Sequence, residues 1–178
     1  MGCAITLVAR NESQAAILEL WDRAAAFEAA PSMRTQNYPP HITLAVLPEV
    51  NAGAVWPKVK AVPAGAASLQ LSFGAIRAFT VPSLVLWAAP EYSARLTDWH
   101  SCLHESLDPA ACHDHYRPEN WVPHCTLATE IKEELKEPAL GLVNESIEPF
   151  QVVFDRFECV STAPVKVYQS IALQRRHP

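Results

Sequence analysis

The order of the predicted elements in the first half of the chain recurs in the second half at a nearly constant distance. An apolar, β-branched stretch at 4–9 predicts a strand, and the following residues predict a helix from about 13 to 30. A strand at 84–89 and a helix at 91–107 repeat that pair about 80 residues later. Because a solenoid needs about three or more repeats, two copies indicate a single domain with two lobes.

The remaining elements of the two halves also follow the same order. The first half continues with a loop over 32–40, a strand over 41–47, a weak helix over 49–62 and strands over 69–79 and 84–89. The second half continues with a loop over 108–123, a strand starting at 124, a short helix over 131–144 and strands over 150–160 and 165–173. We therefore expect an α+β fold for 1–178. Its two duplicated halves, of about 4–83 and 84–173, are expected to carry antiparallel sheets backed by helices.

Length and composition exclude several classes of protein. The 178 residues, of which 49% are hydrophobic and 19% charged, suffice for a packed core without a metal or disulfide. The net charge of −5 does not favour binding to a long nucleic acid. The five glycines are too far apart for a dinucleotide-binding or Walker A loop, so Rossmann and P-loop folds are excluded.

The sequence also predicts where the protein resides. No apolar run approaches the roughly 20 residues that span a bilayer, and the N-terminus lacks the pattern of a secretory signal. The five cysteines are an odd number without CxxC spacing, which indicates reduced thiols. We expect a cytoplasmic protein without a membrane partner, and a monomer is favoured.

Two histidine tetrapeptides carry the strongest functional signal. They are His41-Ile42-Thr43-Leu44 and His124-Cys125-Thr126-Leu127, and a proline precedes each. On a strand, alternate side chains share one face, so each histidine points the same way as its threonine. If the two halves are related by pseudo-symmetry, both pairs can face one cleft.

Two imidazoles and two hydroxyls suit the cleavage of a phosphodiester. Histidine, whose unperturbed pKa is about 6.5, can act as the base for the attacking oxygen or as the acid for the leaving oxygen. Threonine hydroxyls can donate hydrogen bonds to the non-bridging oxygens. This set needs no metal or other cofactor. The alternative is that the two motifs are duplicated structural residues.

The paired motifs resemble those of the 2H phosphoesterase superfamily, which includes bacterial 2′-5′ RNA ligase-like proteins and plant cyclic phosphodiesterases. The resemblance covers essentially the whole chain. It implies a bilobal fold with a central cleft and metal-independent action on 2′,3′-cyclic phosphates or 2′-5′ phosphodiester bonds. It also implies that His41 and His124 are catalytic and that Thr43 and Thr126 hold the phosphate. Thr129 stands where many bacterial members carry a basic residue, which favours a cyclic nucleotide or a short RNA end as substrate.

Five further residues are candidates for substrate binding. Tyr38 and Trp121 lie three residues before the two histidines, where an aromatic ring could stack on a base. Arg34 and Arg117 lie in the same two loops and could contact a phosphate or ribose. Tyr168 on the last predicted strand could line the cleft. Packing residues and solvated arginines are the alternatives.

Two other functions remain open on sequence grounds. One is a nucleotide- or RNA-binding module that uses the same cleft without turnover. The other is a zinc hydrolase built on a second group of residues: His100, His104, Cys112, His113 and His115. Against zinc, the two helical histidines are expected at the solvated flank of their helix. Cys125 is expected to be a core thiol rather than a nucleophile.

Overall fold

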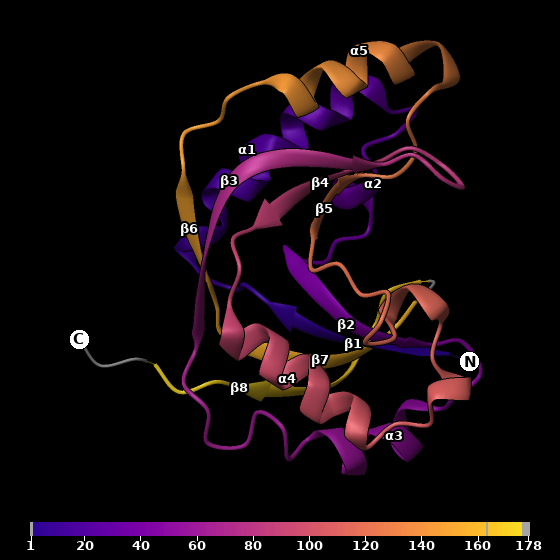
Figure 1. The fold of residues 1–178 in the computed structure, drawn as a ribbon, viewed down its shortest axis with the longest axis vertical. Helices are drawn as coiled ribbons and strands as arrows, with labels where there is room; N and C mark the ends of the chain where they lie inside the picture. The colour runs from indigo at the N-terminus through magenta and orange to yellow at the C-terminus, as the bar shows by residue number, and fades with distance from the viewer. Residues whose placement is uncertain (1, 163, 176–178) are drawn as a thin grey trace.

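The computed structural model describes residues 2–162 and 164–175, and its strands form two antiparallel sheets (Figure 1). The strands are β1 (Cys3–Val8), β2 (His41–Leu47), β3 (Leu69–Phe79), β4 (Val85–Pro90), β5 (Cys125–Ala128), β6 (Phe150–Phe154), β7 (Arg156–Ser161) and β8 (Val167–Ala172). The order of the first sheet is β2-β1-β7-β8, and that of the second is β5-β4-β3-β6. The expected α+β class is confirmed, and both histidine motifs lie at edge strands.

Helices cover the two ends of the molecule, with α1 and α5 at one end and α3 and α4 at the other (Figure 1). The α-helices are α1 (Ala15–Ala24), α2 (Ser32–Thr35), α3 (Ala52–Val59), α4 (Ala94–Glu105) and α5 (Lys136–Gly141). The 3₁₀-helices are η1 (Glu12–Gln14), η2 (Ala25–Phe27), η3 (Pro109–Ala111), η4 (Asp114–Tyr116), η5 (Glu133–Leu135) and η6 (Leu142–Asn144). Within the described ranges, no helix is long and apolar enough to cross a membrane.

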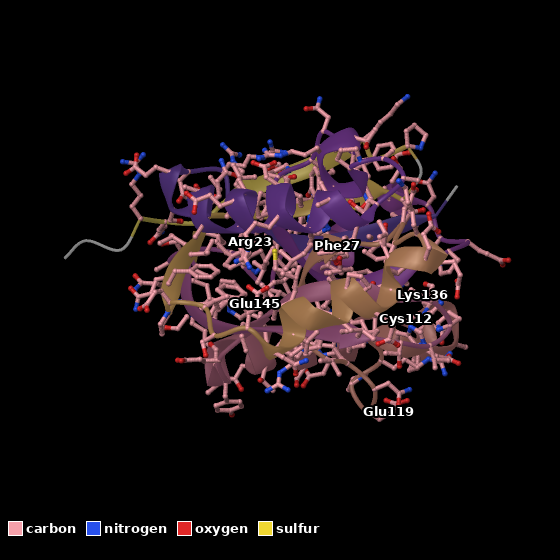
Figure 2. The ribbon with its side chains drawn as sticks, turned by 90° about the horizontal axis from the view of Figure 1, so that it is seen from above. Arg23, Phe27, Cys112, Glu119, Lys136 and Glu145 are labelled. Atoms are coloured by element: carbon pink, nitrogen blue, oxygen red, sulfur yellow. The ribbon has the colours of Figure 1, made fainter. Side chains whose placement is uncertain are left out.

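The helix after β1 forms as predicted but ends earlier. The Asn11 side chain caps η1 by accepting a hydrogen bond from the Ser13 amide, and Ile17 and Trp21 of α1 are buried. Regular α-helix stops at Ala24 rather than near residue 30, and η2 continues it to Phe27. Figure 2 shows Arg23 of α1 beside Glu145, with which it forms an ion pair that joins α1 to the segment after η6.

Each of the two long helices contacts the sheet to which its own preceding strand does not belong. Helix α1 follows β1 of the first sheet but packs against β5 of the second. Helix α4 follows β4 of the second sheet, and its His104 side chain bonds to the Leu44 carbonyl on β2 of the first. The helices therefore link the two sheets, whose edge strands β2 and β5 also contact each other directly.

The predicted single strand over 150–160 is wrong, because the chain forms two strands that belong to different sheets. Asp155 separates β6 from β7, and its amide donates to the Val8 carbonyl at 2.9 Å. The Asp155 carboxylate accepts a hydrogen bond from the Arg10 amide at 2.9 Å. These contacts with the end of β1 fix the bend. As a result β3, from 4–83, lies in the second sheet, whereas β7 and β8 lie in the first.

Three smaller expectations also need correction. The loop over 32–40 contains α2, because the buried Glu28 carboxylate accepts hydrogen bonds from the amide and hydroxyl of Ser32. The loop over 108–123 contains η3 and η4. The helix predicted over 91–107 is shorter, since Ser93 caps α4 and the helix runs over Ala94–Glu105.

Candidate active site

Strands β2 and β5 bring the two histidine motifs next to each other. On β2, Ile42 and Leu44 are fully buried, whereas His41 and Thr43 are only partly buried. On β5, Cys125 and Leu127 are buried and Thr126 is partly buried, as is His124 just before the strand. The predicted alternation is therefore confirmed in both strands. Because β2 and β5 contact each other, the two motifs share one region of the molecule.

A main-chain carbonyl two residues earlier fixes the ring of each histidine. Nδ1 of His41 lies 2.9 Å from the Pro39 carbonyl oxygen, and Nδ1 of His124 lies 2.7 Å from the Val122 carbonyl oxygen. A carbonyl can only accept, so Nδ1 carries the proton in each ring. Nε2 is therefore the atom that gains or loses a proton, which is the requirement for a general acid or base.

The surroundings lower the pKa of both histidines. Burial is the main cause at His41, and the positive charge of His124 lowers its pKa further, while the Pro39 carbonyl and the Glu158 carboxylate raise it. Burial also lowers the pKa of His124, although the hydrogen bond to the Val122 carbonyl acts to raise it. The effect of the His124 charge on His41 favours a state in which only one of the two rings is charged.

A tryptophan fixes each motif threonine through the main chain. Nε1 of Trp21 on α1 donates to the Thr126 carbonyl at 2.9 Å, and Nε1 of Trp121 donates to the Thr43 carbonyl at 3.0 Å. At the edge of a sheet, some carbonyls have no strand partner, and the indoles occupy two of them. The sequence did not reveal these bonds, because each joins residues that are far apart along the chain.

Tyr38, which packs against His41, belongs to a polar network with Glu158 and Arg10. The Tyr38 ring lies 4.9 Å from the His41 ring, and the Tyr38 hydroxyl donates to Glu158 at 2.8 Å. Arg10 forms two hydrogen bonds to the same carboxylate, at 3.1 and 3.2 Å. Burial strongly raises the pKa of Tyr38. Only 6% of the surface of Tyr38 is exposed, whereas the predicted stacking role needs an open ring face.

His124 lies in an aromatic corner on the opposite side. The Phe79 ring meets it edge-on at a centroid distance of 5.1 Å, and Trp87 lies 5.9 Å away. Phe79 and Trp87 also stack on each other at 4.9 Å. These contacts restrict the rotation of the His124 ring and exclude water from one of its sides.

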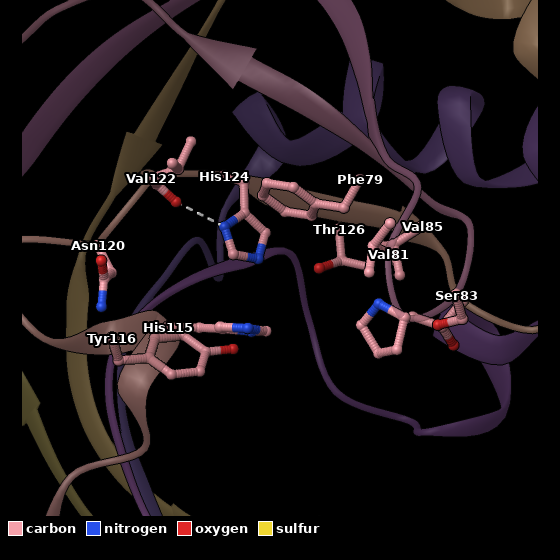
Figure 3. A pocket seen from close by; sticks show the side chains of 12 residues that line it. Phe79, Val81, Ser83, Val85, His115, Tyr116, Asn120, Val122, His124 and Thr126 are labelled. Carbon is pink, nitrogen blue, oxygen red and sulfur yellow. Dashed lines mark hydrogen bonds between the residues drawn. The ribbon is translucent and has the colours of Figure 1, made fainter.

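A cavity of about 340 Å³ opens beside His124 (Figure 3). The turn between β3 and β4 forms one wall, the segment 115–122 forms the other, and His124 and Thr126 lie between them. His115 and Tyr116 lie across the opening from His124 (Figure 3). Neither residue was singled out from the sequence as a neighbour of the motifs. Among the described residues, His41 and Thr43 lie outside the lining.

The structure places both predicted arginines away from this cavity. Arg34 forms an ion pair with Asp22 at 2.8 Å and lies over the Trp21 ring, which ties it to α1. Arg117 pairs with Asp114 at 2.9 Å and lines a different cavity. The described lining of the cavity beside His124 includes neither residue.

The two remaining candidates also differ from expectation. The rings of Trp121 and His100 are nearly parallel, with centroids 3.8 Å apart. His100 therefore covers one face of the Trp121 ring, which was predicted to stack on a base. Tyr168 is 40% exposed and lines a cavity with Asn51 and Gln169 rather than the one beside His124.

The predicted alternative of a zinc site has no geometric support. His100 is buried rather than solvated, and its Nε2 bonds to the Tyr116 carbonyl at 3.0 Å. Burial lowers the pKa of His100 to about 4. Nε2 of His104 is taken by the Leu44 carbonyl at 3.1 Å. Within the described ranges, no three histidine, cysteine or acidic side chains come together as a metal site.

Cys125 is a core thiol, as expected. It is 1% exposed, and burial raises the pKa of its thiol to about 12. A thiol that stays protonated is not a nucleophile.

The fold, two antiparallel sheets with a histidine and a threonine at an edge strand of each, matches the fold expected of the 2H phosphoesterases. The family comparison agrees, since the model of the 2′-5′ RNA ligase superfamily matches residues 12–165. The chain belongs to this superfamily.

Solved structures show the same fold. TT0787 of Thermus thermophilus matches with a TM-score of 0.64 and 17% identity, covering 99% of this chain and 100% of that one. E. coli LigT matches with a TM-score of 0.59 and 17% identity, covering 97% of each chain. No curated protein sequence matches. At these identities the structural likeness establishes the fold, and membership of the superfamily supports a phosphoesterase- or ligase-type enzyme.

Proposed function

We propose that the protein hydrolyses 2′,3′-cyclic phosphates of nucleotides or short RNA ends, or 2′-5′ phosphodiester bonds, without a metal. The observation that carries the proposal is the matched pair of imidazoles, each with Nδ1 bonded to a carbonyl and Nε2 left for proton transfer. LigT, which shares the fold, is known in complex with 3′-AMP, phosphate, NADP⁺ and ATP. Those ligands support a nucleotide as the substrate.

The proposed reaction divides proton transfer between His41 and His124. Nε2 of the neutral imidazole takes a proton from water as the water oxygen bonds to phosphorus. Nε2–H of the charged imidazole donates its proton to the ribose oxygen as the P–O bond breaks, which opens the ring and leaves a phosphomonoester. The hydroxyls of Thr43 and Thr126 donate hydrogen bonds to the non-bridging oxygens.

The test is turnover of a panel of 2′,3′-cyclic mononucleotides and 2′-5′ dinucleotides in excess EDTA. We expect hydrolysis of at least one cyclic nucleotide, with no gain from added Mg²⁺, Mn²⁺ or Zn²⁺. The variant His113→Asn, which changes a member of the alternative zinc group, should retain this turnover. His113 caps η4 with its side chain, and asparagine can do the same. Binding without turnover would instead indicate a nucleotide-binding module. Activity that is lost in EDTA and restored by Zn²⁺ would overturn the metal-free mechanism.

A further inference from the structure

We infer that the cavity beside His124 holds the nucleoside of the substrate and that Asn120 and His115 recognise its base. This inference rests on the proposed function, which places the reacting phosphate between the two imidazoles. The cavity adjoins only one of them, since its lining includes His124 and Thr126. A substrate whose phosphate lies at the histidines therefore has this space on the His124 side for its remaining atoms.

The cavity suits an uncharged group of limited size. Among the described residues that line it, none is Lys, Arg, Asp or Glu. A second phosphate would find no cation here, whereas a base and a ribose carry no charge to neutralise. Its volume of about 340 Å³ is at the lower end of the range for small-molecule sites. We therefore expect a single nucleoside rather than an oligonucleotide.

The two walls of the cavity suit the apolar face and the polar edge of a base. Phe79, Val81 and Val85 supply an apolar wall, and Val81 is 81% exposed. A flat ring laid against Val81 removes apolar surface from water on both partners. The opposite wall carries the polar groups of His115, Tyr116 and Asn120 (Figure 3).

The Asn120 amide is the group best suited to read the edge of a base. Nδ2 donates to the Asp114 carbonyl at 3.1 Å, which engages one of its two N–H groups. Among the described contacts this is the only hydrogen bond of the amide, so its oxygen and second N–H are available. A donor and an acceptor held side by side form the pattern that bidentate recognition of a base requires.

His115 lies on the same wall, and its neighbour provides a control. His115 lines both this cavity and the one on the other side of the segment, whereas His113 lines the second and not the first. Removing the His115 ring should weaken contact with the nucleoside. His113→Asn keeps the cap of η4 and removes a ring that lies 4.9 Å from the His115 ring without itself lining this cavity, so it controls for the loss of a neighbouring ring.

The test measures binding rather than turnover, by calorimetry with the four nucleoside 3′-monophosphates and with inorganic phosphate. We expect at least one nucleotide to bind the unmodified protein more tightly than phosphate does. Asn120→Ala and His115→Ala should each reduce that advantage about 3- to 10-fold, the effect of losing one or two hydrogen bonds. Their affinity for phosphate should not change, and His113→Asn should behave like the unmodified protein.

Two results would overturn the inference. One is nucleotides that bind no more tightly than inorganic phosphate, and the other is full nucleotide affinity in both Asn120→Ala and His115→Ala. Because 3′-monophosphates are not cleaved in this assay, its outcome does not depend on turnover. An inactive protein that still shows the nucleotide advantage would refute the proposed function and leave the base site standing.

Discussion

Nε1 of Trp121 donates a hydrogen bond to the main-chain oxygen of Thr43, 3.0 Å away on the edge of the neighbouring lobe. The bond links the loop before one histidine motif to the strand of the other. Its geometry depends on His100, on which the Trp121 ring stacks. The loop that precedes His124 thus holds Thr43 of the first motif in place.

Trp121→Phe removes this hydrogen bond and keeps an aromatic ring against His100. We expect kcat to fall about tenfold on a cyclic nucleotide, with a smaller change in KM, since a misplaced threonine weakens transition-state contacts first. Loss of the bond should cost about 1 kcal/mol of stability. Steady-state kinetics and urea unfolding measure the two effects. Trp56→Phe on α3 is the control, and equal losses in both variants would deny Trp121 a positioning role.

Replacement of either motif histidine should abolish most activity. We expect His41→Ala and His124→Ala each to lower kcat at least about 10²-fold, because each removes one step of proton transfer. Since both act in one transition state, the double variant should lose far less than the product of the single losses. Rates on one cyclic nucleotide, with circular dichroism as a check on folding, decide this. Near-normal turnover by either single variant would remove that histidine from the mechanism.

The pH dependence of kcat/KM follows from the lowered pKa values of the two histidines. One ring must be neutral while the other is charged, so the profile should be bell-shaped, with apparent values that belong to the pair. Burial lowers the pKa of both rings, so the optimum of the free enzyme should lie below about 6.5, the ordinary histidine value. Initial rates between pH 4 and 9 test this expectation. A plateau that extends above pH 8 would contradict it.

Stability should fall as the pH drops below about 6.5, because His100 is buried in its neutral form. In the folded protein its pKa is about 4, so the unfolded chain binds more protons between those two values. The loss attributable to His100 should reach about 2 kcal/mol at pH 5 relative to pH 7.5. His104, whose pKa burial also lowers, adds to the effect.

Urea unfolding of the unmodified protein and of His100→Gln at both pH values measures that contribution. Glutamine can still donate to the Tyr116 carbonyl but does not titrate. We expect a smaller decrease in the variant. An identical pH dependence in both proteins would show that His100 does not couple protonation to folding.

The facing of the motif residues was predictable because it depends on a local period. Ile42 and Leu44 point into the core, which forces His41 and Thr43 to the other side, and no distant contact is needed to see this. The partners of Tyr38 and Trp121 were not predictable. Each makes its hydrogen bond to a residue far along the chain, Glu158 and Thr43. The sequence therefore showed that aromatic rings lie next to the motifs but not which groups they contact.

The break at Asp155 illustrates a second limit of sequence patterns. Residues 150–154 and 156–161 both favour a strand, and nothing in their composition separates them. What separates them is a pair of hydrogen bonds at Asp155, whose amide donates to Val8 at the end of β1 and whose carboxylate accepts from the amide of Arg10 just beyond it. The information lies in the tertiary contact, so a continuous strand was the natural prediction from the sequence.

The exchange of strands between the halves has a consequence for how the chain reaches its native state. The first sheet needs β7 and β8, which follow the whole second histidine motif along the chain. A growing chain therefore contains β1 long before its partner β7, and an isolated N-terminal half would leave one edge of β1 unpaired. Pairings over such sequence separations slow folding and leave edges open to aggregation. We therefore expect the two sheets to form together rather than one after the other.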